Sequence, residues 1–170
     1  MPKKQKAKKS PELPWIICDT REKKGFHFKK SKNCAGMIVQ KLDYGDYSIK
    51  GLEHFVIIER KQTITELCNN LGKHRARFYR EIERMDHVDH KFIVVEDYLS
   101  AIHNQRYTRM SASAILGSIV SLMLKHDIQV IFAGTHKNAQ DISRKILIKA
   151  YQYFLEYQAE EEKAERGDWD

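Results

Sequence analysis

Short apolar runs, rich in branched and aromatic residues, recur along the chain between polar or glycine-containing segments. Runs of this length and composition are typical of buried β-strands. They predict strands at residues 15–18, 37–42, 47–49, 56–60, 92–95 and 129–133.

Helical patterns fill the second half of the chain. Thr63 and Glu66 have the spacing of a capping box, in which two side chains accept hydrogen bonds at a helix start. Further on, apolar residues recur three and four positions apart, as on one face of a helix. One predicted helix starts at Thr63, and three others cover residues 75–86, 111–125 and 138–157.

The order of these elements predicts the fold class. Strands come first and then alternate with helices, which is typical of a sheet covered by helices. We therefore expect an α/β fold in which helices flank a central mixed β-sheet.

The proline positions mark where the folded part begins. All three prolines precede Trp15, and a chain of 170 residues suits one domain. We expect a basic disordered arm at residues 1–13, a single domain at residues 14–157 and an acidic tail at residues 158–170.

The charge distribution indicates a polyanionic partner. Residues 1–10 hold five lysines and no acid, whereas residues 156–170 hold seven acids against two basic residues, so the ends cancel. Residues 11–155 therefore carry the whole net charge of +7. A basic surface of this kind favours nucleic acid as the partner.

Composition also excludes several classes of protein. No apolar run is long enough to cross a bilayer, and no signal-peptide pattern follows the lysine-rich start. The three cysteines include no CxxC pair, so neither a disulfide framework nor a zinc site is indicated. We expect an intracellular protein, in the cytoplasm of a bacterium or of a phage-infected cell.

Acids and a lysine stand where short apolar runs end. Side chains alternate along a strand, so Glu59 and Lys61 point to one side of the sheet and Arg60 to the other. Clustered carboxylates repel each other unless a cation neutralises them, and oxygen ligands favour Mg²⁺ or Mn²⁺. Such an ion assists phosphodiester hydrolysis. The alternative is a solvated strand end at which Glu59 and Lys61 simply pair.

Several segments, in order, resemble one known family. They are residues 17–22 (ICDTRE), 42–47 (LDYGDY), 58–61 (IERK), 71–78 (LGKHRARF), 94–96 (VVE) and 131–133 (IFA). Over residues 15–155 the chain resembles the nuclease domain of the XPF/Hef family of structure-specific endonucleases. The resemblance implies a restriction-endonuclease-like sandwich and a metal-dependent enzyme that cuts branched or junction DNA.

The resemblance also implies roles for particular residues. Asp46 and Glu59 match the principal metal ligands of the family, and Asp19 and Glu22 match additional acids of the site. Lys61 matches the catalytic lysine. Its role stays open between orienting a water molecule, deprotonating that water and stabilising charge on the phosphate.

Two departures from the family pattern matter. The family signature places an acid four residues after its lysine, whereas here the acid comes one residue later, as Glu66. Because the capping box explains Glu66, we leave it out of the metal site. The helix-hairpin-helix motifs of many relatives are also missing, so the chain resembles stand-alone bacterial and phage versions of the domain.

Basic residues at positions 73–80 suggest that this segment binds DNA. The alternative is that they only form the exposed side of a solvated helix, with intrahelical ion pairs such as Arg77 with Glu81. The resemblance implies that Arg60 matches the signature arginine of the family and that Arg75 matches a DNA-proximal arginine. The expected DNA contacts are Arg21, Arg60, Lys73, Arg75, Arg77 and Arg80.

Two further expectations concern the oligomeric state and an alternative function. The predicted helix at residues 111–125 is apolar around much of its circumference, so it is either deeply buried or pressed against another subunit. Relatives in the family dimerise through this region, and we expect a homodimer. The rival function is a non-catalytic DNA-binding subunit, since the family includes members that lost the active site.

Overall fold

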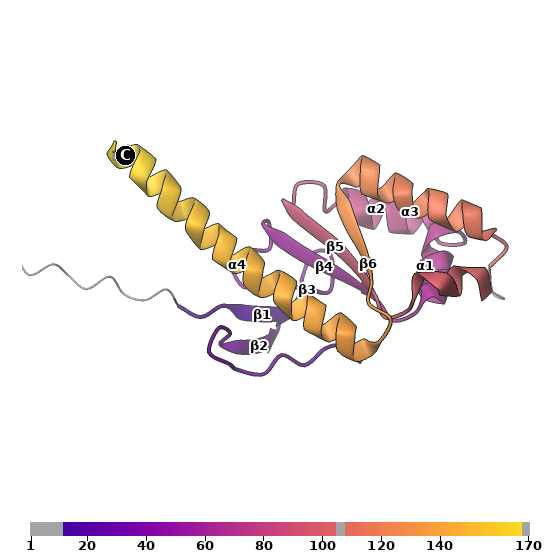
Figure 1. Cartoon of the computed structure of the whole chain (residues 1–170), viewed down its shortest axis with the longest axis horizontal. Helices are drawn as coiled ribbons and strands as arrows, with labels where there is room; N and C mark the ends of the chain where they lie inside the picture. The colour runs from indigo at the N-terminus through magenta and orange to yellow at the C-terminus, as the bar shows by residue number, and fades with distance from the viewer. Residues whose placement is uncertain (1–11, 105–107, 168–170) are drawn as a thin grey trace, which may run out of the picture.

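A computed structural model describes residues 12–104 and 108–167 of the chain. These residues form one sheet of six strands in the order β2-β1-β3-β4-β5-β6 (Figure 1). The strands are β1 (Trp15–Cys18), β2 (Gly36–Val39), β3 (Tyr47–Ile49), β4 (Val56–Lys61), β5 (His90–Val95) and β6 (Ile128–Phe132).

The sheet is mixed, as expected from the order of elements. Strand β3 runs antiparallel to both of its neighbours, β1 and β4. The pairs β1–β2, β4–β5 and β5–β6 are parallel. The prediction of a central mixed sheet is therefore confirmed.

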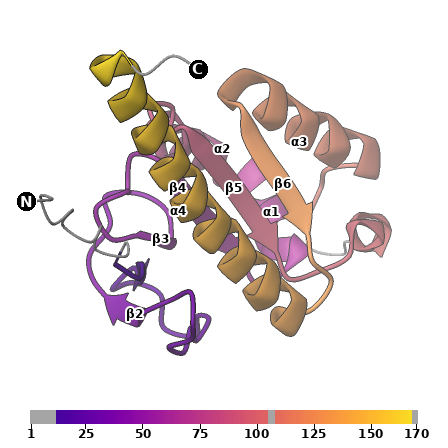
Figure 2. The ribbon, with the colours of Figure 1, turned by 60° about the vertical axis from the view of Figure 1, so that its left-hand side comes forward.

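Helices cover both faces of the sheet. Helices α1 (Ile64–Leu71), α2 (Arg75–Glu83) and α3 (Ala112–His126) pack on one face, and α4 (His136–Arg166) packs on the other (Figures 1 and 2). A short 3-10 helix, η1 (Leu99–Asn104), follows β5. Within the described ranges, no helix combines the length and apolar content that crossing a bilayer requires.

Side-chain alternation along β4 divides the core into two layers. Ile57 belongs to the apolar cluster beneath α1, α2 and α3, whereas Ile58 belongs to the cluster beneath α4. The same alternation carries Glu59 and Lys61 to the first face and Arg60 to the second. Strand β4 therefore presents different chemistry to each side of the sheet.

The capping-box prediction for α1 is confirmed in its Thr63 half. The Thr63 hydroxyl accepts a hydrogen bond from the Glu66 backbone N–H at 3.1 Å, which satisfies a donor that a helix start otherwise leaves unpaired. The Glu66 carboxylate accepts its bond from the Gln62 backbone N–H at 3.0 Å, one residue before the expected Thr63 N–H.

Element ends differ from the sequence-based expectation at several places. Strand β2 ends at Val39 rather than at residue 42, because the Leu42 N–H turns inward to donate to the Asp19 carboxylate at 2.6 Å. Helix α2 ends at Glu83, before the expected residue 86. The 3-10 helix η1 was not predicted.

Helix α4 is longer than expected and ends at Arg166 rather than near residue 157. Its last part extends beyond the sheet (Figures 1 and 2), so no buried stripe marks it in the sequence. Glutamate, lysine, alanine and arginine dominate there, and their helix propensity is high. The acidic segment from residue 158 thus continues the helix, while most of the basic arm, residues 1–11, lies outside the described residues.

Gly45 fixes the turn that leads into β3, and replacing it tests that constraint. Its φ is +66°, and an added Cβ would lie 2.5 Å from Cγ1 of Ile57. Gly51 also has positive φ, at +83°, but faces open space, so Gly51→Ala serves as the control. We expect Gly51→Ala to lower the free energy of unfolding by about 1–2 kcal/mol, and Gly45→Ala by about 1–3 kcal/mol more. Urea unfolding measures both, and equal losses would contradict the predicted clash.

Candidate active site

A groove of about 240 Å³ opens beside the end of β4, on the face covered by α1 and α2. It combines acidic, basic and amide side chains from several elements. Its lining consists of Arg21, Asp43, Tyr44, Gly45, Asp46, Glu59, Lys61, Glu66, Asn70, Arg77, Glu81, Arg84 and Met85.

Asp46 and Glu59 form the acidic centre of this groove. The Asp46 backbone N–H donates to the Ile58 carbonyl at 2.8 Å, and its carboxylate accepts from the Arg60 N–H at 2.7 Å. Burial and the negative charge of Glu59 raise the pKa of Asp46 well above its usual value. The backbone therefore holds two carboxylates close enough to repel each other.

Lys61 shares the side of β4 that carries Glu59, as strand alternation predicts. Its Nζ lies 2.6 Å from Oε1 of Glu59 and 3.6 Å from Oε1 of Glu66. Burial disfavours the charged form of Lys61. The negative charges of Glu59 and Glu66 together outweigh this effect, so the pKa of Lys61 is raised. The side chain is therefore an ammonium in this arrangement, which suits it to stabilise negative charge rather than to accept a proton.

Glu66 lines the groove, although the sequence-based prediction leaves it out of the site; Asp43 and Asn70 line the groove without having been predicted. The Glu66 carboxylate accepts a bond from the Gln62 N–H just before the helix start, and the same side chain lines the groove and faces Lys61. The available signal was its position one residue beyond the acid of the family signature. The two roles are compatible, because Oε2 accepts the bond from Gln62 and Oε1 faces the lysine.

The structure does not bring Asp19 into the groove. Its side chain has no exposed surface, and its oxygens accept bonds from the Arg21 N–H at 2.9 Å and the Leu42 N–H at 2.6 Å. Burial raises the pKa of Asp19, but the bonds from Arg21 and Leu42 lower it more, so the net shift is downward. Asp19 thus closes the turn after β1 as an ionised carboxylate.

Arg60 and Glu22 meet on the opposite side of β4. The buried guanidinium of Arg60 lies 2.5 Å from Glu96 and 3.2 Å from Glu22, and it stacks over the Phe26 ring at 5.2 Å. Burial opposes the charge of Arg60, but the hydrogen bond that Arg60 donates to Glu96 raises the pKa of Arg60. Arg60, expected to contact DNA, therefore has no free surface to offer, because alternation turns it toward the α4 side.

The other arginines expected to bind DNA are exposed. Arg21 and Arg77 line the groove with side chains 64% and 77% exposed. Arg77 also pairs with Glu81 at 3.1 Å, as the alternative interpretation of this helix has it, and Arg75 stacks on the Tyr79 ring at 4.4 Å. The remaining two, Lys73 and Arg80, are exposed and outside the groove.

The donor set of the groove fits a hard cation. In residues 12–104 and 108–167, no three His, Cys, Asp or Glu side chains converge closely enough to bind one ion together. Magnesium, however, is commonly held by one or two carboxylates, with water and substrate phosphates as its other ligands. The Asp46–Glu59 pair supplies two such oxygen donors, and a cation between them would relieve their repulsion.

Two other places are weaker candidates. A cavity of about 390 Å³ between α4 and the sheet has a mostly apolar lining without a carboxylate. In the segment at residues 86–90, Asp86 bonds the His126 ring at 2.9 Å and His87 bonds the Tyr44 hydroxyl at 2.8 Å. Protein contacts thus account for these groups, in agreement with a polar loop.

Comparison with known proteins identifies the family. A model described as the ERCC4 domain matches residues 18–146, most of the 170-residue chain. The chain therefore belongs to the ERCC4 domain family.

One curated protein matches most of this chain but only a small part of its own length. The putative ATP-dependent RNA helicase MJ1505 of Methanocaldococcus jannaschii is 28% identical over 142 residues, which is 83% of this chain but only 16% of that protein.

Solved structures of XPF from Aeropyrum pernix share the fold. One superposes with a TM-score of 0.58 at 20% identity, over 82% of this chain and 61% of that one. Another, in complex with DNA, gives a TM-score of 0.61 at 20% identity, over 82% and 66% of the two chains. The resemblance to XPF nuclease domains and the fold class expected from the sequence are confirmed.

The repulsion at the acidic centre predicts a pH-dependent stability. Because the folded-state pKa of Asp46 is raised, the folded protein binds its proton more tightly than the unfolded chain does. Stability is therefore lost as pH rises from about the usual value of 3.8 through the raised pKa. In EDTA at pH 8, Asp46→Asn should melt higher than wild type, by roughly 2–4 °C per kcal/mol of relieved repulsion.

Thermal melts at pH 4 and pH 8 measure the difference, which should be much smaller at pH 4. Asp43→Asn removes an equal charge from an exposed residue of the same groove and is the control. A lower melting temperature for Asp46→Asn than for wild type at pH 8 would contradict the predicted repulsion.

Proposed function

We propose that this chain is a divalent-metal-dependent DNA endonuclease that hydrolyses phosphodiester bonds. One observation carries the proposal: Asp46, Glu59 and Lys61 line one groove, in a chain of the ERCC4 domain family, and the two carboxylates repel each other. Branched or junction DNA is the proposed substrate. DNA repair, recombination or phage DNA processing is the proposed setting.

The proposed cofactor is Mg²⁺ or Mn²⁺, held by Asp46 and Glu59. Such an ion, when bound, polarises a phosphate oxygen and lowers the pKa of a coordinated water. Asp19 and Glu22 have other partners in the protein, so neither is proposed as a direct ligand of the ion. The Glu22 carboxylate contributes negative charge near Asp46 and helps to raise the pKa of Asp46.

The chain's own residues account for positioning. The Arg60 N–H and the Gly45 turn hold the Asp46 carboxylate in place. Lys61, kept charged by Glu59 and Glu66, stabilises negative charge that develops on the phosphate. Arg21 and Arg77 at the groove contact neighbouring phosphates, and Lys73, Arg75 and Arg80 extend this contact along α2.

A cleavage assay tests the proposal. Wild type and Glu59→Gln are incubated with flap, fork and linear DNA in the presence of Mn²⁺ or Mg²⁺. We expect wild type to cut and Glu59→Gln to be slower by about 10²-fold or more, with DNA binding retained, since it loses a charge at the reacting centre. Comparing the three DNAs also reads out any preference for branches.

Glu83→Gln is the matched control, because Glu83 is an exposed carboxylate of α2 outside the groove. It should cut as wild type does. DNA binding by wild type without cutting would instead support the non-catalytic DNA-binding subunit.

We also propose a homodimer formed through α3. One side of this helix is buried through Ile115, Ile119 and Leu122. The adjacent side exposes a second apolar stripe, in which Leu124 is 81% exposed. A stripe of this kind on a soluble domain is characteristic of a protein interface. Its residues are Leu116, Val120, Met123 and Leu124.

Charge placed on this stripe should separate the subunits. Wild type should sediment as a dimer at micromolar concentration, and Val120→Glu combined with Leu124→Glu should sediment as a monomer, because burying two carboxylates is costly. Lys125→Glu lies on the other flank of α3 and should leave the dimer intact. Analytical ultracentrifugation measures all three, and a monomeric wild type would contradict the dimer.

A further inference from the structure

The connection between β1 and β2 is the most basic stretch within the described part of the body. Residues 23–35 of this connection contain five lysines and no Asp or Glu. All five, Lys23, Lys24, Lys29, Lys30 and Lys32, are exposed and lie within ten residues of each other. We call the segment at residues 23–35, with these five lysines, the basic connection. None of them forms an ion pair with any residue in the ranges 12–104 and 108–167.

The basic connection is held rigidly, although it forms no regular strand between residues 22 and 30. Phe26 and Phe28 are buried in the core, and the Phe26 ring stacks on Tyr47 with centroids 5.0 Å apart. The Phe26 N–H donates to the Tyr47 hydroxyl at 2.7 Å, and the His27 N–H donates to Gln140 of α4 at 2.9 Å. Because the two phenylalanines point inward, the residues between and after them point outward.

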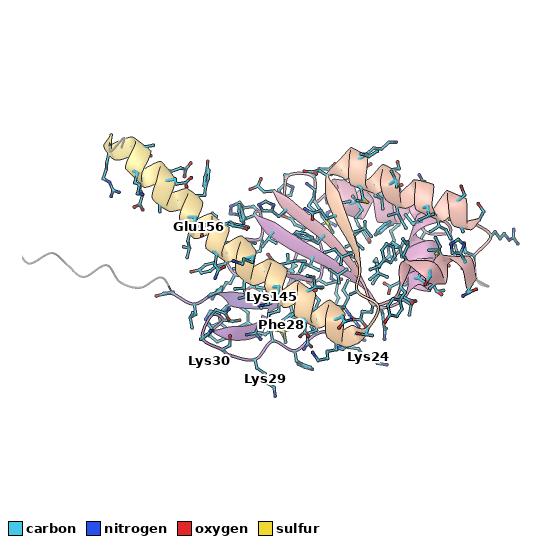
Figure 3. All side chains as sticks on the ribbon, in the orientation of Figure 1. Lys24, Phe28, Lys29, Lys30, Lys145 and Glu156 are labelled. Carbon is cyan, nitrogen blue, oxygen red and sulfur yellow. The ribbon has the colours of Figure 1, made fainter. Side chains whose placement is uncertain are left out.

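A second anchor lies further along the connection. Arg144 of α4 donates to the Ser31 hydroxyl at 2.6 Å, and the backbones of Ser31 and Cys34 pair with each other. Figure 3 shows Lys24, Lys29 and Lys30 along one rim of the molecule, beside α4. The charges are thus displayed on a preorganised segment, which lowers the entropic cost of binding.

The chain lies at the candidate groove just before the basic connection and again after β2. Arg21, just before it, lines the groove and donates to the Leu42 carbonyl at 3.2 Å. Lys41, which follows β2, lines a neighbouring hollow together with Tyr44, which also lines the groove. The basic connection therefore lies on the chain segment that leaves the groove at one rim and returns to it.

Packing does not require these lysines. Core contacts in this segment are made by the phenylalanines, and the nearby Lys137 of α4 has its own partner, Asp141, at 2.6 Å. A fixed group of like charges without a counter-charge creates a positive potential that attracts a polyanion. The continuity with the groove favours the polyanion that the groove binds.

We propose that the basic connection binds the phosphate backbone of DNA outside the catalytic groove, and so holds the part of the substrate that extends past β1 and β2. This surface lies apart from the arginines of α2, and it adds a second phosphate contact to the one proposed there. The inference rests on the proposed function for the identity of the polyanion as DNA.

Salt dependence of DNA binding tests this surface directly. The full chain carrying Lys24→Gln, Lys29→Gln and Lys30→Gln is compared with wild type, using a fluorescein-labelled DNA fork, EDTA and a series of KCl concentrations. Each lost phosphate contact lowers the slope of log K against log salt by about 1, so the triple variant should lose about 3. The matched control is Lys50→Gln, Lys125→Gln and Lys163→Gln, which removes the same charge from exposed lysines elsewhere and should leave the slope nearly unchanged.

The outcomes separate this inference from the proposed function. Equal slopes for the two triple variants would overturn the inference, and cutting by wild type in Mn²⁺ would still support the nuclease. A reduced slope in a protein that never cuts would support the surface and contradict the enzyme. Failure of wild type to bind DNA would overturn the inference. So would a triple variant that loses binding to phosphatidylserine vesicles but keeps the wild-type DNA slope, since the partner would then be a membrane.

Discussion

The alternation of side chains along β4 is the constraint on which the rest of the site depends. The last three residues of this strand are charged, and because of the pleat Glu59 and Lys61 point to one face of the sheet and Arg60 to the other. Meanwhile the Arg60 N–H holds the Asp46 carboxylate, so one residue positions the groove through its backbone and braces the sheet through its side chain. A shift of one residue in register would exchange the two faces and dissolve both arrangements.

The ion pairs of Arg60 on the α4 face of the sheet explain how the protein folds despite the acidic groove on the other face. The Arg60 guanidinium is enclosed by Glu22 and Glu96, and Glu96 also bonds the His136 ring at the start of α4 at 3.0 Å. Leaving such a buried charge without its partner costs about 3–5 kcal/mol, so the network strongly favours one packing of α4. The repulsion between Asp46 and Glu59 can persist in that rigid frame, whereas in a looser one the carboxylates would move apart.

Local patterns in the sequence were sufficient for much of this structure. The capping residues at Thr63 and Glu66, and the shared side of Glu59 and Lys61, follow from spacing alone. Burial of Arg60 and the closing bonds of Asp19 could not be predicted from spacing, because their partners, Glu96 and Leu42, are distant in sequence. The outer part of α4 was missed for a different reason, since a solvated helix carries no apolar stripe.

The distribution of charge around the groove is consistent with a site completed by its ligands. Arg21, Arg77 and Arg84 at the groove attract a phosphate, whereas the carboxylates at its centre repel one. The protein alone does not neutralise these carboxylates, because Lys61 is already paired with Glu59 and leaves the rest of the negative charge in place. A divalent cation would remove the repulsion between the carboxylates and the phosphate, since it would neutralise the acids and bind the phosphate oxygens at the same time. Under the proposed function, metal and nucleic acid would therefore bind cooperatively, each lowering the electrostatic cost of binding the other.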